Sequence, residues 1–177
     1  MKFSNFLEVL SFRVQAQPDN LSFTFLADGE TLSHQLTFKE LVHQAQAIAT
    51  ELHRLQAQGE RALLLYQPGL DFIVSFLGCL YAGVVPVPAY PPKANKSLGR
   101  LTAIINSAEV KFALTTHNLL ASIQQKLTDK AEFSSILTIA SDRVPALNGE
   151  FTEFYRPQAN DLAFCNTPVV RRGIPRG

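Results

Sequence analysis

The chain has 177 residues, 46% of them hydrophobic and 18% charged, so it is long and apolar enough to bury one hydrophobic core. A formal net charge of +1 gives no electrostatic reason to expect nucleic acid as a partner. Two cysteines cannot build a disulfide framework, and no run approaches the ~20 apolar residues of a membrane span. Glu8 and Arg13 interrupt the apolar pattern of the N-terminus, which therefore lacks a signal-peptide core, and we expect a cytoplasmic protein.

The N-terminal stretch predicts a helix followed by a β-hairpin. Ser4 can cap a helix whose apolar residues recur at helical spacing, and Pro18 ends that helix. The stretches LSFTFLA and TLSHQLT then alternate apolar and polar residues on either side of Asp28-Gly29. This alternation predicts a hairpin with one solvent-exposed face.

A second helix is predicted from the segment LTFKELVHQAQAIATELHRL. Thr37, with Glu40 three residues later, has the pattern of a capping box, in which side chain and backbone bond reciprocally. We expect this helix to end near Gly59.

Residues 63–92, LLLYQPGLDFIVSFLGCLYAGVVPVPAYPP, are the centre of the predicted fold. They contain an apolar run, a Pro-Gly break, an apolar stretch of helical length, an Ala-Gly stop, and a second apolar run with a proline-rich exit. Apolar runs without alternation suit strands that are buried on both faces, and parallel pairing requires a crossover such as the intervening helix. We therefore predict a βαβ unit.

Alternating helices and strands continue after the proline-rich loop. Residues 97–108 and 118–130 have helical patterns, and the runs VKFALTT and SSILTIA have the composition of strands. This order predicts a doubly wound α/β fold, with a mostly parallel sheet, helices on both faces and the N-terminal hairpin. Residues 141–160 are polar and predict a surface connection, and residues 162–164 begin another apolar run.

The four histidines are the first candidates for chemistry, because histidine is the usual acid, base or metal ligand near neutral pH. His34 lies in the hairpin, and His43 and His53 lie ten residues apart on one helix, too far to share a metal. His117 follows a strand, where α/β folds often place sites. Without a ligand cluster around them, we interpret all four as surface or helix-cap residues.

A basic patch of Lys93, Lys96 and Arg100 follows the proline-rich stretch. It could receive a phosphate or an acidic partner, but we favour a solvated loop and helix start. Asp71 offsets the positive end of the central helix dipole, and Cys79 is expected to be a small buried hydrophobic residue.

The aromatic residues of the central helix, Phe72, Phe76 and Tyr81, recur four or five residues apart, which indicates core packing. No GxGxxG, GxxxxGK or GxSxG motif is present. We therefore assign no catalytic, cofactor-binding or metal-ligating residue to this chain.

Two segments resemble a known family. The segment that begins LTFKEL resembles the first motif of the adenylate-forming enzymes. Residues 63–92 resemble the fatty acyl-AMP ligases, in which LYxPGLDFI leads through GCLYAG to VPxxPP. The resemblance covers about residues 3–164. It implies that residues 1–163 form the N-terminal part of an AMP-binding domain, which is a partial subdomain of an adenylate-forming enzyme.

The resemblance also implies an activity for the full-length family. These enzymes use ATP and Mg²⁺ to convert a fatty acid to an acyl-adenylate and pyrophosphate, and then pass the acyl group to an acyl carrier protein. A phosphate loop of the form YTSGSTGxPKG follows a strand that resembles the LAF of residues 162–164. In this chain the sequence CNTPVVRRGIPRG stands there instead.

Residues 164–177 are interpreted as a frameshifted version of that loop. With suitable codons, one added T after the Phe164 codon gives FLQYTSGSTGYPKG. Without the loop and the downstream parts, we expect no cofactor and no activity for this chain alone. We also expect it to self-associate through uncovered apolar faces.

Two alternatives remain open at this point. One is a non-catalytic α/β module that binds a protein partner. The other is a fragment of an acyl-CoA synthetase, which shares the adenylation step but uses coenzyme A as the acceptor.

Overall fold

The computed structural model describes residues 2–92, 98–127, 131–147, 154–158 and 160–165. The elements in chain order are α1 (Phe6–Ala16), β1 (Leu21–Leu26), β2 (Leu32–Thr37), α2 (Phe38–Arg54), β3 (Arg61–Leu65), α3 (Leu70–Ala82), β4 (Val85–Ala89), α4 (Gly99–Ala108), β5 (Phe112–Thr115), α5 (His117–Leu127), α6 (Ala131–Ser134), β6 (Leu137–Ala140) and the 3-10 turn η1 (Ser141–Arg143). Within these ranges, no helix has the length and apolar character needed to cross a bilayer.

The predicted parallel sheet is confirmed. Its four strands lie in the order β4-β3-β5-β6, and all three neighbouring pairs are parallel. Strand β3 is central, and its last four residues are buried, as the unbroken apolar run predicted. The βαβ unit is therefore β3-α3-β4.

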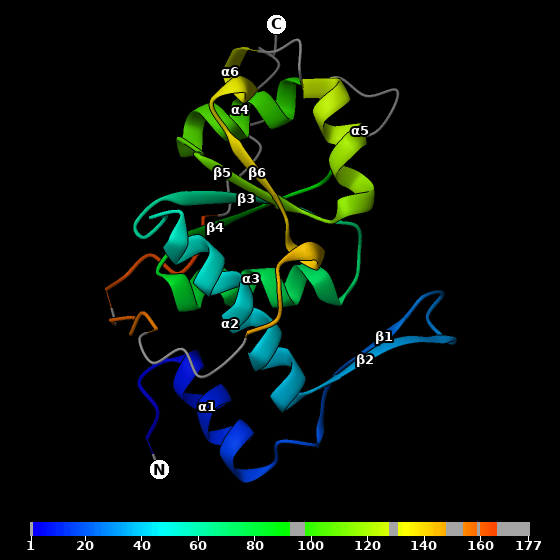
Figure 1. The fold of residues 1–177 in the computed structure, drawn as a ribbon, viewed down its shortest axis with the longest axis vertical. Helices are drawn as coiled ribbons and strands as arrows, with labels where there is room; N and C mark the ends of the chain where they lie inside the picture. The colour runs from blue at the N-terminus through cyan, green and yellow to red at the C-terminus, as the bar shows by residue number, and fades with distance from the viewer. Residues whose placement is uncertain (1, 93–97, 128–130, 148–153, 159, 166–177) are drawn as a thin grey trace, which may run out of the picture.

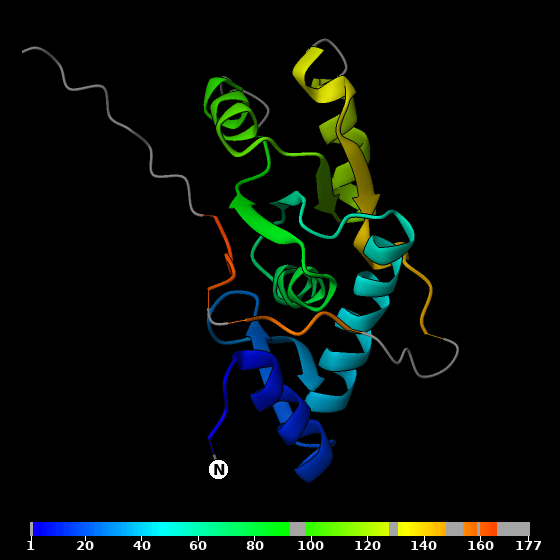
Figure 2. The same ribbon diagram turned by 90° about the vertical axis from the view of Figure 1, so that its left-hand side faces the viewer.

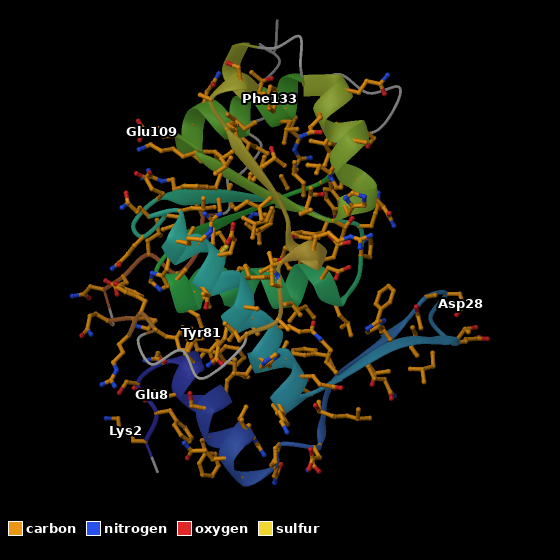
Figure 3. All side chains as sticks on the ribbon, in the orientation of Figure 1. Lys2, Glu8, Asp28, Tyr81, Glu109 and Phe133 are labelled. Atoms are coloured by element: carbon orange, nitrogen blue, oxygen red, sulfur yellow. The ribbon has the colours of Figure 1, made fainter. Side chains whose placement is uncertain are left out.

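Helices cover both faces of the sheet (Figures 1 and 2). Leu64 and Tyr66 belong to the core cluster shared with α1, α2 and α3, whereas Leu63 and Leu65 belong to the cluster formed with α4, α5 and α6. This alternation follows from the two-residue period of a strand. Figure 3 shows Tyr81 on the α1 side of the molecule, far from Phe133 in the α4–α6 layer.

The packing of α2 against α3 depends on a glycine. A Cβ atom at Gly78 would lie 2.7 Å from Ile48 Cγ2 and 3.0 Å from the carbonyl oxygen of Ala45. Real Cβ atoms do not approach other heavy atoms within 3.0 Å, so only glycine permits this helix separation. The first glycine of the GCLYAG motif is thus a packing requirement.

The caps of the first two helices differ in how well they were predicted. Asn5 rather than Ser4 caps α1, because the Asn5 side chain accepts a hydrogen bond from the backbone N–H of Glu8. The predicted capping box of α2 is confirmed in both of its hydrogen bonds.

The end of α2 was predicted too late. The helix ends at Arg54, well before Gly59. Gln56 has a φ of 55° and Gly59 a φ of 79°, so two left-handed residues turn the chain toward β3. The helical pattern cannot continue through such a turn.

The hairpin is confirmed as an antiparallel β1-β2 pair, but the expectation of a single exposed face was wrong. Most of its residues are exposed on both faces, and Leu36 is the fully buried one among them. Figure 1 shows the hairpin extending away from the sheet. Several of its apolar residues therefore face solvent in this structure, including Leu21, Leu26 and Leu32.

The two helices predicted after β4 are present in the described residues. Helix α4 spans Gly99–Ala108 and α5 spans His117–Leu127, one residue earlier than the predicted start of α5, and residues 97 and 128–130 lie outside the described residues. Ser134, which was expected to begin a strand, ends the short helix α6.

The outer edge of β4 carries prolines at alternate positions. The carbonyl oxygen of Pro86 accepts a hydrogen bond from the backbone N–H of Cys165, at 3.0 Å, so Pro86 faces away from β3. Pro88 lies two residues later and has the same orientation. Because proline has no N–H, this edge accepts hydrogen bonds at both positions but donates none.

Candidate functional site

The carboxyl ends of parallel strands are where α/β folds place their sites. Three strands of this sheet end side by side, at Leu65, Thr115 and Ala140. Tyr66 follows β3 directly and Ser141 follows β6 directly, so the topology brings both to this edge.

A chain of buried hydroxyl groups joins the strand ends to α3. The Tyr66 hydroxyl lies 2.7 Å from Ser75 Oγ and donates to Ser141 Oγ at 2.7 Å. Ser141 in turn donates to the carbonyl oxygen of Thr115 at 3.2 Å. Burial raises the pKa of Tyr66 well above its ordinary value, so this hydroxyl stays protonated and serves as a donor rather than a base. The arrangement fixes the end of β6 to the end of β3.

Replacing Tyr66 with phenylalanine is expected to destabilise the fold. Ser75 and Ser141 would lose a buried partner, at a cost of about 1–3 kcal/mol in the free energy of unfolding. Urea denaturation of Tyr66→Phe measures this loss. The matched control is Tyr90→Phe, because Tyr90 is 76% exposed and its substitution should leave the midpoint unchanged. Equal midpoints for the two variants would contradict the role of the hydroxyl chain.

A hollow of about 310 Å³ lies next to this junction. Its lining residues come from α2, α3 and the segment after β6: His43, Gln44, Ala47, Ile48, Asp71, Val74, Ser75, Ser141, Asp142, Val144 and Ala146. Burial and the neighbouring Asp142 raise the pKa of Asp71, while His34 acts in the opposite direction. Asp142 accepts a hydrogen bond from the backbone N–H of His117 at 2.7 Å, which ties η1 to the start of α5.

The four histidines are not brought together as a site. His34 lies on the exposed hairpin, His43 lines the hollow, His53 lies in the last turn of α2, and His117 begins α5. Among the described residues, no three His, Cys, Asp or Glu side chains are grouped so that they could hold a metal ion.

Of the three residues of the basic patch, Arg100 lies within the described residues. Lys93 and Lys96 lie outside the described residues, and Arg100 is exposed in the first turn of α4. Asp71 lies in the first turn of α3, where the helix dipole favours a carboxylate.

The aromatic residues of α3 pack in the core, as predicted. The rings of Phe72 and Phe76 are 6.0 Å apart, and that of Tyr81 lies 5.2 Å from Phe154. Cys79 is fully buried, and burial raises the pKa of its thiol.

Buried tyrosines make the fold sensitive to alkaline pH. Burial raises the pKa of Tyr81 from 10.0 to about 12, and that of Tyr66 further. Above pH 10.0 the unfolded chain loses tyrosine protons that the folded chain keeps, so stability should fall as pH rises toward about 12. Urea unfolding over this range measures the slope. Tyr81→Phe should make the slope shallower, and an unchanged slope would contradict this assignment.

The connection after β6 is more than the surface segment that was expected. Ser141 is buried, and Phe154 packs against the α1–α3 core cluster. Tyr155 lies over Gly83, and the Phe164 ring is 6.0 Å from that of Phe76. The aromatic residues within a polar stretch were the signal for this packing.

The segment after this connection leads to the outer edge of β4. Residues 162–165 form no regular strand, but the Cys165 N–H bonds to Pro86 there. Of residues 164–177, where the frameshifted tail is expected, residues 166–177 lie outside the described residues.

Known proteins are similar to this chain over most of its length. A family profile described as AMP-binding enzyme matches residues 10–168. The medium-chain-fatty-acid–acyl-carrier-protein ligase JamA of Moorena producens is 35% identical over 182 residues, covering 99% of this chain and 30% of that protein. A long-chain-fatty-acid–AMP ligase of Mycobacterium tuberculosis is 33% identical over 134 residues, covering 74% of this chain and 23% of that protein.

A solved structure has the same fold. The fatty acyl-adenylate ligase of L. pneumophila, in complex with acyl adenylate and pyrophosphate, superposes with a TM-score of 0.77 at 31% identity. The match covers 92% of this chain and 28% of that protein, so the chain spans less than a third of the length of these relatives. By its family profile and its sequence identity, the chain belongs to the AMP-binding enzyme family and corresponds to the N-terminal segment of the fatty acyl-AMP ligases.

Proposed function

We propose that residues 1–163 supply the N-terminal part of the adenylation domain of a fatty acyl-AMP ligase, which acts in the cytoplasm. The observation that carries this proposal is the 35% identity over 99% of the chain to a fatty-acid ligase, joined to the shared fold. In the complete enzyme, a fatty acid carboxylate attacks the α-phosphate of ATP, forming acyl-AMP and releasing pyrophosphate. The acyl group then passes to the thiol of an acyl carrier protein, and AMP leaves.

The described residues contribute the scaffold for this reaction. Among the residues that the structure describes, no three His, Cys, Asp or Glu side chains lie together as a metal-ligand cluster. Tyr66 remains protonated in its buried junction and is not available as a base. Substrate and nucleotide contacts belong to the rest of the proposed enzyme.

Residues 164–177 are proposed to be a frameshifted phosphate loop. Sequencing the gene from the Leu162 codon onward tests this directly. One missing base, followed by codons for an adenylation domain, is the expected result. A continuous frame that passes through the CNTPVV codons into an ordinary downstream domain would overturn it.

The activity is tested with this chain and with the product of the frame-restored gene. Fatty-acid-dependent pyrophosphate release is expected from the restored protein and not from this chain. Mass spectrometry then identifies acyl-AMP, and carrier protein and coenzyme A are compared as acceptors. Acyl transfer to coenzyme A would favour the acyl-CoA synthetase alternative. A folded restored protein without acyl-AMP formation would exclude the ligase and favour the interaction module.

A further inference from the structure

The chain after β6 crosses the molecule and is fixed at the corner between α3 and β4. The backbone N–H of Tyr155 donates to the carbonyl oxygen of Tyr81 at 2.9 Å, and the preceding residue, Phe154, packs on the Tyr81 ring. The Tyr155 ring then covers Gly83, where a Cβ atom would lie 2.8 Å from the ring carbon Cγ. Gly83 also has a φ of 66°, which terminates α3. Glycine is therefore required there for two independent reasons.

A tight turn continues from this anchor. The Asp161 carboxylate accepts hydrogen bonds from the Tyr155 hydroxyl and from the backbone N–H of Gln158. The Asp161 N–H donates back to the Gln158 carbonyl oxygen at 3.1 Å. These bonds lower the pKa of Asp161, so the carboxylate is charged and able to accept both hydrogen bonds near neutral pH.

The segment after this turn docks against α3 and β4. The Phe164 ring lies 6.0 Å from that of Phe76, and the Cys165 side chain packs against the core cluster on the α4–α6 side of the sheet. The Cys165 N–H meets the carbonyl oxygen of Pro86. Because the prolines of β4 provide no N–H groups, the ladder at this edge lacks half of its bonds, and the segment needs another anchor.

We propose that Tyr155, seated on Gly83 and bonded to Asp161, is a positioning residue that holds residues 162–165 against the edge of β4. This inference rests on the proposed function, because that segment leads to the place where the phosphate loop of a fatty acyl-AMP ligase is expected. Tyr155 touches no reacting atom in this role. Tyr155 fixes the position of residues 162–165, from which the chain continues toward the expected nucleotide site.

The thiol of Cys165 offers a direct measurement on this chain. Cys165 is partly exposed, whereas Cys79 is fully buried and its thiol pKa is raised, so a thiol reagent should report on Cys165 first. Tyr155→Ala should increase the labelling rate of Cys165 about tenfold through local opening. The thermal unfolding midpoint should change little, because Tyr155 is outside both core clusters.

Three further variants separate positioning from general destabilisation. Tyr155→Phe keeps the ring on Gly83 and should restore most of the slow labelling. Gly83→Ala should also accelerate labelling, because its Cβ atom displaces the ring. Unlike Tyr155→Ala, it should lower the thermal midpoint as well, because the φ of 66° at this position strains any residue other than glycine. Tyr90→Ala removes an exposed tyrosine after β4 and should leave the labelling rate unchanged.

A wild-type labelling rate in Tyr155→Ala would overturn the proposal. So would equal acceleration in Tyr90→Ala, which would indicate a general loosening of the β4 edge. This experiment needs no nucleotide, so its outcome is independent of the ligase assay. In the frame-restored protein, Tyr155→Ala should raise the KM for ATP and leave the KM for the fatty acid unchanged.

Discussion

Replacing Leu64 with alanine lowers the free energy of unfolding by about 2–5 kcal/mol, which is the range for deleting a fully buried leucine side chain. Leu64 has no exposed surface and lies in the central strand, between Pro88 of β4 and Leu114 of β5. Side chains that are held by the sheet on both sides cannot collapse into the space left behind. Whole domains of this size are stable by only about 5–15 kcal/mol, so the variant should be close to unfolding at ambient temperature.

Urea denaturation followed by circular dichroism measures this effect. The matched control is Leu32→Ala on the hairpin, where the leucine is 55% exposed, and the expected change is within about 0.5 kcal/mol. If both variants lost the same stability, the assignment of β3 as the centre of the core would be wrong.

Gly78→Val is expected to be the most damaging substitution on α3. The added Cβ atom alone meets Ile48 Cβ at 2.8 Å and the Ala45 carbonyl at 3.0 Å, and neither atom can rotate away. Helices α2 and α3 must therefore separate, at a cost of about 3 kcal/mol or more for an overpacked core. Thermal unfolding of the variant checks this result.

Gly78→Ala and Gly69→Ser complete the series. Alanine gains about 1 kcal/mol of helix propensity over glycine, so Gly78→Ala should lie between wild type and Gly78→Val. At Gly69 an added Cβ atom would meet no atom closer than 3.9 Å, and serine is a good N-cap residue. Gly69→Ser should therefore leave the thermal unfolding midpoint unchanged. A Gly78→Val protein as stable as Gly69→Ser would refute the close approach of the helices.

Local patterns in the sequence were sufficient to predict much of the fold. Thr37 and Glu40 lie three residues apart, so their capping box is a local matter. The βαβ unit was equally predictable, because buried parallel strands have a characteristic apolar run and require a crossover. The glycines of GCLYAG were recognised as a family signature, but glycine is required at these positions because of tertiary contacts, which the sequence does not show. Gly78 permits a helix contact and Gly83 lies under Tyr155.

The hydroxyl junction could not be predicted in the same way. Tyr66 and Ser141 are separated by 75 positions and meet only because β3, β5 and β6 lie side by side in the sheet. Neither residue belongs to a motif. The hairpin was predicted correctly, but its exposure was not, because alternation shows that a strand can bury one face, whereas burial itself depends on a covering element.

The prolines of β4 bear on how two copies of this chain could meet. Edge-to-edge pairing of sheets requires each strand to offer N–H groups to the carbonyl oxygens of the other. Two β4 edges would present acceptors to acceptors at Pro86 and Pro88, so this edge is not complementary to itself. A homodimer built by extending the four-stranded sheet would have to use β6, at the opposite end of the strand order. Pro86 and Pro88 leave this edge able to accept hydrogen bonds from residues 162–165 but unable to donate any at these two positions. The same property disfavours aggregation of newly made chains by strand pairing at this edge.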